Sequence, residues 1–313
     1  MAKLLLSTGN IVSSGRSFIR SPGGVRSNLE LTASLRGSVE ATKEDLAEEL
    51  DYETGTAPES VSQTLQNTQL PPWTELVGEN TLYVPRIQWP EVGLQDEPSR
   101  YDITVKLFFL PLASLAERAA YAAEALDLVR KELGISAIDL LIVSFPGLSF
   151  ESDCEWKADQ LNATQGNFED EVATWVILEE LHRSGAVKKM GTSEFGSEKL
   201  AKFLEAVQIK PRVNQISVRD CCKVPPPLAK LADKEGIELF THTDTVDVLP
   251  SGTLRELLGH GELGAGLLAG PGEENGLQGD LRPRWVVKYT AVVRDRGVIE
   301  NKGYFACADL VST

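Results

Sequence analysis

The sequence predicts an α/β protein with the architecture of a (β/α)8 barrel of the TIM type. Beyond about residue 100, short apolar runs alternate with stretches in which apolar residues recur every three or four positions. Strands joined through single helices require right-handed parallel crossovers, and a series of them in one chain favours a closed barrel. The chain has 313 residues, of which 42% are hydrophobic. We therefore expect one barrel domain over 1–313.

Two elements precede this repeat. Leu4–Leu6, followed by Ser-Thr-Gly, is typical of a strand and its turn. Residues 40–60 hold eight acidic residues and one lysine, and Leu46 and Leu50 lie four positions apart among them. This pattern predicts a solvated, acidic surface helix over about 42–53.

The repeat opens with a strand over Tyr101–Leu110, whose residues are mostly β-branched or aromatic. Ser114 and Glu117 form a capping-box pair that begins a helix, and Gly134 ends it. The run Ile138–Ser144 is almost continuously apolar, as expected of a strand covered on both faces.

The same alternation continues to about residue 241. Asn167 is the predicted N-cap of a helix that ends near Gly185. The remaining elements are a strand over 188–192, a helix from Ser197, a strand over 212–218, a helix entered through the prolines at 225–227 and ended by Gly236, and a strand over 237–241. A doubly wound open sheet is the alternative, but no G-x-G-x-x-G follows a strand.

Two stretches do not fit the repeat. Residues 54–75 are rich in Thr, Ser, Gln and Pro, and residues 259–282 are rich in glycine with little periodicity. Neither stretch carries a motif with chemistry in it. We expect both to be flexible excursions from the barrel.

The composition restricts the function. Lys and Arg number 31 against 46 Asp and Glu, a net charge of −15, which disfavours nucleic acid and anionic membrane surfaces as partners. No run approaches the ~20 apolar residues of a bilayer span, and the four cysteines do not make a disulfide framework. We therefore expect a cytoplasmic protein. The basic, serine-rich residues 1–29 make mitochondrial targeting the alternative.

Polar residues at the predicted carboxyl ends of the strands form the candidate site, because barrel active sites lie there. They are Lys106, Ser144, Ser193, Glu194, Gln215 and His242. No carboxylate pair, zinc-ligand spacing, P-loop or G-x-S-x-G accompanies them. The pattern alone therefore predicts neither a catalytic set nor a metal site.

Cys221 and Cys222 are an unusual pair. Adjacent cysteines rarely bond each other, because the intervening peptide strains the disulfide. If Arg219 or Lys223 lowers a thiol pKa, the pair is a redox or intermolecular candidate. The alternative is that both are reduced thiols packed as small apolar groups.

Several strings resemble those of one family, in the same order and spacing. They are STGNIVSSGR, AIDLLIVSFP, GAVKKMGTSEF, KPRVNQISVRDCCKVPPPL, GIELFTHTD and WVVKYTAVVRDRGVIENKGYF. The family is that of the regulatory (modifier) subunits of glutamate–cysteine ligase, and the resemblance covers residues 3–16 and most of 100–308. That family is in turn similar to aldo-keto reductases, which agrees with the predicted barrel.

The resemblance implies that reductase chemistry has been lost. Aldo-keto reductases use Asp, Tyr, Lys and His, with Tyr as the general acid. Lys106 stands at the position of the Lys, whereas Ser144 replaces the His. Asp51 and Tyr52 are adjacent rather than about five residues apart, and no apolar strand precedes them. Lys106 and Ser144 are thus vestigial positions, and no catalytic residue is implied.

The cofactor pocket is altered in the same comparison. The reductase string S-N-F becomes Ser193-Glu194-Phe195, which places an anion where an amide holds the carboxamide. Gln215 is retained, and His242 replaces the aromatic residue that stacks on nicotinamide. The resemblance implies no cofactor, and weak residual NADPH binding stays open as the alternative.

By this resemblance the chain is not an enzyme but a non-catalytic regulatory subunit. It would bind the catalytic subunit of the ATP-dependent glutamate–cysteine ligase as a heterodimer, improve glutamate use and relieve feedback inhibition by glutathione. A divergent NADPH-dependent aldo-keto reductase is the alternative. The candidate partner surfaces are the loop with Cys221 and Cys222 and the final segment 294–304, with Arg294 and Arg296.

Overall fold

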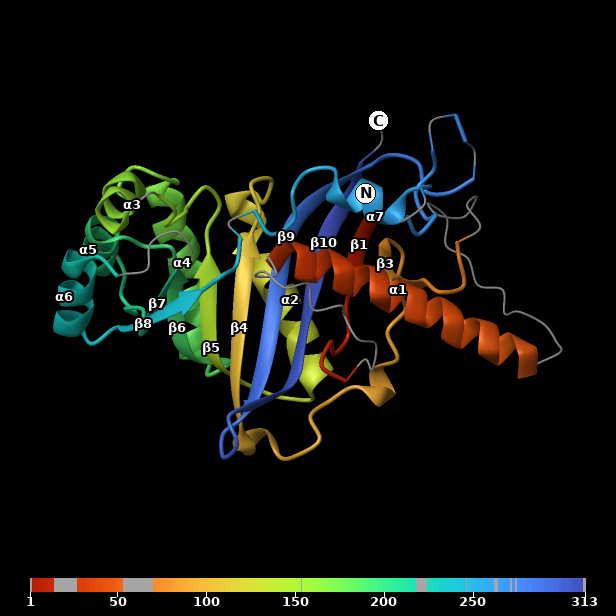
Figure 1. The fold of residues 1–313 in the computed structure, drawn as a ribbon, viewed down its shortest axis with the longest axis horizontal. Coiled ribbons are helices and arrows are strands. Elements are labelled where there is room, and N and C mark those ends of the chain that lie inside the picture. Colours follow the sequence, from red (N-terminus) through yellow and green to blue (C-terminus); the bar gives the residue numbers. More distant parts are fainter. Residues whose placement is uncertain are drawn as a thin grey trace.

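The structure, a computed structural model, is built on one ten-stranded sheet (Figure 1). It describes residues 2–13, 27–52, 70–152, 154–217, 224–245, 247–261, 264–270, 272–273 and 275–311. Across the sheet the strands run in the order β2 (Glu75–Val77), β3 (Thr81–Val84), β1 (Ala2–Ser7), β10 (Val298–Val311), β9 (Asp280–Val293), β4 (Tyr101–Phe109), β5 (Ile138–Ser144), β6 (Val187–Ser193), β7 (Val213–Ser217) and β8 (Glu238–His242).

The α/β class is confirmed, and the predicted strands coincide closely with β1 and β4 to β8. These last five strands pair in parallel, as single-helix crossovers require. The sheet nevertheless differs from a closed (β/α)8 barrel. Its edges are β2 and β8, which do not pair with each other in the described part of the chain.

The physical reason for the open sheet is the long hairpin of β9 and β10. β9 pairs antiparallel with β4 from Tyr101–Val293 to Phe109–Trp285, so the edge of β4 that a barrel needs for closure is occupied. β10 pairs antiparallel with both β9 and β1. The hairpin therefore extends the sheet outward, between the parallel strands and β1 (Figure 1).

The helices begin and end where local chemistry dictates. Asn167 caps α4, its side-chain oxygen accepting a hydrogen bond from the Asp170 backbone N–H at 3.2 Å. Gly134 and Gly236 end α2 and α6 in the left-handed conformation, at φ of 65° and 67°. The α-helices are α1 (Ser27–Tyr52), α2 (Arg118–Leu133), α3 (Glu155–Asn162), α4 (Phe168–Arg183), α5 (Ser197–Ala206), α6 (Pro226–Glu235) and α7 (Thr253–Leu258).

Short 3-10 turns complete the chain path. They are η1 (Trp89–Glu91), η2 (Pro98–Arg100) and η3 (Leu115–Glu117). The predicted pair of Ser114 and Glu117 forms, but as a hydrogen bond between the two side chains and not as a cap on the backbone. The pair flanks η3, and α2 begins after it, at Arg118. The acidic helix predicted over 42–53 is the second half of the longer α1.

The hairpin strands separate two cores because their side chains alternate between the two faces of the sheet. In β10, Phe305 and Cys307 lie in the core that includes α2, α4 and α5. Tyr304, Ala306 and Ala308 lie in the second core, which α1 and α7 help to form. Figure 1 shows α1 crossing the hairpin and β1 on this second face.

The two stretches outside the repeat have different outcomes. Residues 53–69, most of the stretch expected over 54–75, lie outside the described residues. In the glycine-rich stretch over 259–282, Leu267, Leu268 and Leu277 are buried in the second core, and Leu268 and Leu277 form a β-bridge. These leucines attach the second stretch to the core.

Candidate functional site

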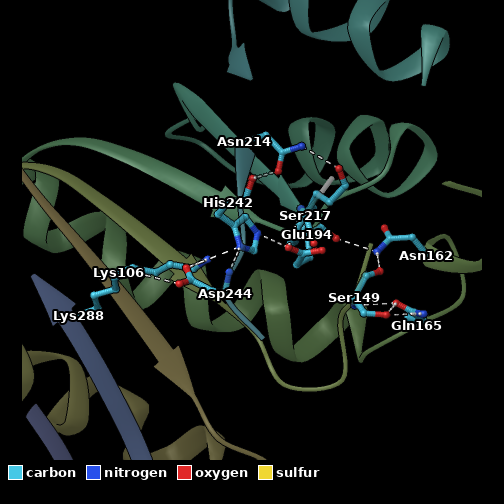
Figure 2. A network of polar contacts seen from close by, with 12 residues as sticks. Lys106, Ser149, Asn162, Gln165, Glu194, Asn214, Ser217, His242, Asp244 and Lys288 are labelled. Carbon is cyan, nitrogen blue, oxygen red and sulfur yellow. Dashed lines mark hydrogen bonds and ion pairs between the residues drawn. The ribbon is translucent and has the colours of Figure 1, made fainter. Parts of the chain in front are cut away.

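Four titratable side chains meet near the carboxyl ends of the parallel strands (Figure 2). Lys106 comes from β4, Lys288 from β9, and His242 ends β8. Asp244 follows His242 by two residues, and its backbone N–H donates to His242 Nδ1 at 3.1 Å. Lys106 and Lys288 lie opposite each other because β9 pairs with β4. The segment that follows β8 brings Asp244 to both lysines.

Asp244 is the centre of this cluster. Its Oδ2 accepts a hydrogen bond from Lys106 Nζ at 2.9 Å, and its Oδ1 accepts one from Lys288 Nζ at 2.9 Å. The side chains of Lys106 and Asp244 are only 5% and 7% exposed. Burial raises the pKa of the Asp244 carboxyl, but the charges of Lys106 and Lys288 outweigh it and hold that pKa well below its ordinary value.

The pKa of Lys106 is lowered. Full burial disfavours its ammonium form, and the nearby Asp244 carboxylate offsets only part of that effect. Two ammonium groups thus share one buried carboxylate. Both oxygens of Asp244 therefore accept hydrogen bonds from lysines of the same protein.

Glu194 forms the other side of the site, directly after β6. Its backbone adopts a φ of 63°, which a residue with a side chain rarely does. The turn is held by three bonds: Glu194 N donates to Gln215 O at 2.8 Å, Asn162 Nδ2 donates to Glu194 O at 2.7 Å, and Ser217 N donates to Glu194 Oε1 at 3.1 Å. The same Oε1 faces His242 Nε2, so the side chain points into the cluster (Figure 2).

The polar atoms around Glu194 bear on whether a nicotinamide cofactor fits here. Within the described residues, the side-chain oxygens of Ser193 and Ser217, with Gln215 Oε1, are buried and have no hydrogen-bond partner. However, Ser193 and Glu194 are 1% and 3% exposed. The Glu194 carboxylate engages His242, and the cavity described below is not lined by these residues. As they stand, the residues do not fit a nicotinamide ring.

Among the described side chains, no tyrosine hydroxyl completes the cluster as a proton donor. The Tyr289 hydroxyl donates to Glu132 and also lies 3.1 Å from Gly9 O, Tyr304 donates to Glu30 at 2.6 Å, and Tyr101 donates to Glu300. In the part of the chain that the structure describes, no hydrogen bond joins a tyrosine hydroxyl to Lys106 or His242. A reductase-type proton transfer from tyrosine therefore has no donor in place there.

The predicted site residues are only partly brought together. Lys106, Glu194 and His242 meet in the cluster, and Ser193 lies opposite Gln215 on the neighbouring strands β6 and β7. Ser144 ends β5, half-buried. Cys221 and Cys222 lie outside the described residues.

The arginines of the final segment lie at the other end of the strands. Arg294 binds Asp102, near the start of β4, at 2.8 Å and lies 3.7 Å from Asp139, near the start of β5. Arg296 is exposed in the same hairpin turn. The turn is thus separate from the cluster at the carboxyl ends.

Sequence reasoning missed Asp244 and Lys288. Both lie in strings that were singled out, GIELFTHTD and WVVKYTAVV. The available signal was a charged residue inside or directly after an otherwise apolar run, since such a charge needs a partner when buried.

The described residues lack two further features. No group of three or more His, Cys, Asp and Glu side chains is arranged to hold a metal ion. None of the helices there combines the length and the apolar character that crossing a membrane requires.

Comparison with known proteins shows two kinds of relative. A glutamate–cysteine ligase regulatory subunit described as putative, from Schizosaccharomyces pombe, is 27% identical over 96% of this chain and 94% of its own length. The human glutamate–cysteine ligase regulatory subunit is 26% identical over 67% of this chain and 66% of its own length. An NADPH-dependent alpha-keto amide reductase from Saccharomyces cerevisiae is 30% identical over 41% of this chain and 36% of its own length.

One solved structure and one family model complete the comparison. An aldo-keto reductase of Bombyx mori in complex with NADP is 22% identical over 45% of this chain and 40% of its own, with a TM-score of 0.33. The sequence model of the aldo/keto reductase family matches residues 94–256, which is just over half of the chain. On that match, the chain belongs to the aldo/keto reductase family.

Proposed function

We propose that this chain is a non-catalytic regulatory subunit that binds the catalytic subunit of glutamate–cysteine ligase as a heterodimer. In that complex it improves glutamate use and relieves feedback inhibition by glutathione, and so acts in glutathione biosynthesis. The names of the yeast and mammalian relatives support a regulatory role.

The observation that carries the proposal is the buried cluster at Asp244. A reductase needs a proton donor that a bound substrate can reach, and a cofactor beside it. Here Lys106 is bonded to Asp244 inside the protein, and the described tyrosine hydroxyls named above bond elsewhere. The charged groups of the cluster are bonded to one another inside the protein and are not available to a substrate. This favours a role in binding a partner over a role in catalysis.

Regulation by binding requires a difference in affinity. The chain must bind the active form of its partner more tightly than the inhibited form, because a binder without preference shifts no equilibrium. A stable heterodimer of this kind buries more than about 1,000 Å² of surface.

The proposal predicts a change in ligase kinetics when the two purified proteins are mixed. We expect co-elution in gel filtration, a lower Michaelis constant for glutamate and weaker inhibition by glutathione. The measurement is the initial rate against glutamate concentration, with and without this chain. An elution profile and kinetics identical to those of the catalytic subunit alone would refute the proposal.

The same assay distinguishes the candidate surfaces. Arg294→Glu with Arg296→Glu reverses two charges in the exposed turn between β9 and β10. Loss of co-elution in this variant places the contact at the turn, whereas unchanged co-elution removes the turn from the interface. Lys202→Glu is the matched control, since its side chain is 59% exposed on α5.

The alternative function is a divergent NADPH-dependent reductase, which membership of the aldo/keto reductase family favours. We propose instead that no nicotinamide cofactor binds tightly, because Ser193 and Glu194 are buried and the Glu194 carboxylate engages His242. NADPH fluorescence on titration with the protein is expected to stay unchanged up to millimolar cofactor. Quenching that saturates at micromolar NADPH, with turnover of an aldehyde, would favour the reductase.

We further propose that the protein acts in the cytoplasm. Residues 1–29 contain β1, which pairs with β10 on one side and β3 on the other. Cleavage of these residues as a presequence would remove an internal strand of the sheet. Cell fractionation distinguishes this location from the mitochondrial alternative.

A further inference from the structure

A cavity of about 380 Å³ lies near β1 and β10. It shares no residue with the Asp244 cluster, which lies near β4 and β9. The loops after β1 and β3 line it together with α1, the end of α2 and β10. Its volume falls at the small end of the ~300–1,000 Å³ typical of small-molecule sites. The residues that matter for its chemistry are Ser38, Thr42, Arg86, Glu132 and Asn301.

Two buried acceptor atoms belong to this lining. Glu132 is 1% exposed; its Oε1 accepts a hydrogen bond from Tyr289 at 3.2 Å, while its Oε2 has no partner among the described residues. Asn301 is 5% exposed, and its Oδ1 likewise has no described partner. A buried acceptor without a donor is costly. Both atoms therefore favour a ligand that brings N–H donors.

The charges on the lining narrow the class of ligand. An ammonium group carries three donors and a positive charge, so it suits the Glu132 carboxylate and the Asn301 carbonyl oxygen together. Arg86, from the loop after β3, adds a guanidinium group to the same lining, and guanidinium groups bind carboxylates well. The hydroxyl-bearing Ser38 and Thr42 come from α1. The cavity thus combines partners for both ends of a zwitterion.

We propose that this cavity binds a free α-amino acid, with its ammonium group at Glu132 and Asn301 and its carboxylate at Arg86. The proposal is independent of the regulatory function above, since it concerns this chain alone. A simple amine offers a group for the two acceptors only, and a simple carboxylate offers a group for Arg86 only.

The protonation of Glu132 gives the site a pH dependence. Burial raises the pKa of Glu132 to about 7, against the opposing effect of the Tyr289 hydrogen bond. The other group facing this carboxyl from β9 is Tyr289, which stays neutral because burial raises its own pKa. The loop after β3 presents the Arg86 guanidinium, and α1 and β10 present Ser38, Thr42 and Asn301, whose side chains do not titrate. Because an ammonium group binds the ionised carboxylate, affinity should rise about tenfold from pH 6 to pH 8.

Isothermal titration calorimetry on the full chain tests the proposal, with glycine, L-alanine and L-glutamate as probes. At least one is expected to bind at pH 8 with a dissociation constant of a few millimolar or tighter. Glu132→Gln should weaken that binding at least tenfold and abolish its pH dependence. Glu180→Gln, at a side chain 75% exposed on α4, is the matched control and should leave it unchanged.

Three results would overturn the proposal. One is the absence of binding by all three amino acids. Another is equal affinity of the protein and its Glu132→Gln variant. The third is binding of ethylamine or acetate as tight as that of the amino acids, because either ligand alone lacks one of the two charges. No catalytic subunit is present in these titrations, so their outcome is separate from that of the ligase assay.

Discussion

Asp244→Ala is expected to lower the free energy of unfolding by about 3–5 kcal/mol, the typical cost of removing one partner from a buried ion pair. Asp244 Oδ2 accepts from Lys106 Nζ, and Oδ1 accepts from Lys288 Nζ. Without the carboxylate, the buried Lys106 ammonium keeps its desolvation cost and loses its bonded counter-ion. Urea denaturation of the protein and the variant at pH 7 measures the difference.

The pH profile separates this electrostatic loss from a simple loss of packing. The pKa of Asp244 is held below its ordinary value in the folded protein. A carboxyl group whose pKa is lower in the folded than in the unfolded state stabilises the fold at pH values above its unfolded pKa of ~3.9. That stabilisation is lost as the pH falls through the folded-state pKa. The protein and Asp244→Ala should therefore differ most at neutral pH and converge in acid.

Two controls make the result specific. Asp102→Ala removes a carboxylate that is 63% exposed and paired with Arg294, and it should cost less than about 1 kcal/mol. Lys106→Met combined with Asp244→Leu removes both buried charges and should recover much of the lost stability. If Asp244→Ala costs no more than Asp102→Ala, the cluster does not stabilise the fold as described.

Much of the parallel half of the sheet was predictable from sequence because its signals are local. The apolar run Ile138–Ser144 coincides with β5, and Ser197 begins α5. Asn167 and Gly236 mark helix ends through chemistry confined to a few residues. In this half of the sheet, strands that are consecutive in the sequence are also neighbours in the sheet. The order of the strands therefore follows from their order in the sequence.

The opening of the sheet was not predictable in the same way. It depends on β9 pairing with β4 across more than 170 residues, for example Tyr101 with Val293. No local sequence pattern predicts which strand pairs with the free edge of β4. The same holds for the site: Lys106 and His242 stand at strand ends, but Lys288 reaches Asp244 only because β9 lies beside β4.

Glu132 shows how a buried charge is overlooked. It lies three residues after Val129 and directly before Leu133, near the end of a helix whose apolar stripe faces the core. Charged residues near helix ends are usually solvated, and nothing local distinguishes Glu132 from these. Its burial follows from the packing of Tyr289 and the loop after β1, elements distant in sequence.

Glu132→Gln is expected to stabilise the protein at alkaline pH and to leave it unchanged in acid. The pKa of Glu132 is raised from 4.5 to about 7 by burial. A raised carboxyl pKa means that the folded protein holds the proton more tightly, so its stability falls as pH rises from 4.5 to 7. At 1.36 kcal/mol per pH unit, this loss approaches about 3 kcal/mol by pH 8. Glutamine keeps an oxygen that accepts from Tyr289 and carries no charge to bury.

Urea denaturation at pH 5 and pH 8 measures this effect, with Glu180→Gln as the exposed control on α4. The control should change stability by less than about 0.5 kcal/mol at both pH values. Parallel pH profiles for the protein and Glu132→Gln would show that Glu132 ionises normally. A more stable variant that no longer binds an amino acid would mean that the ionised carboxylate is retained at a cost to folding, because a ligand ammonium group can use it.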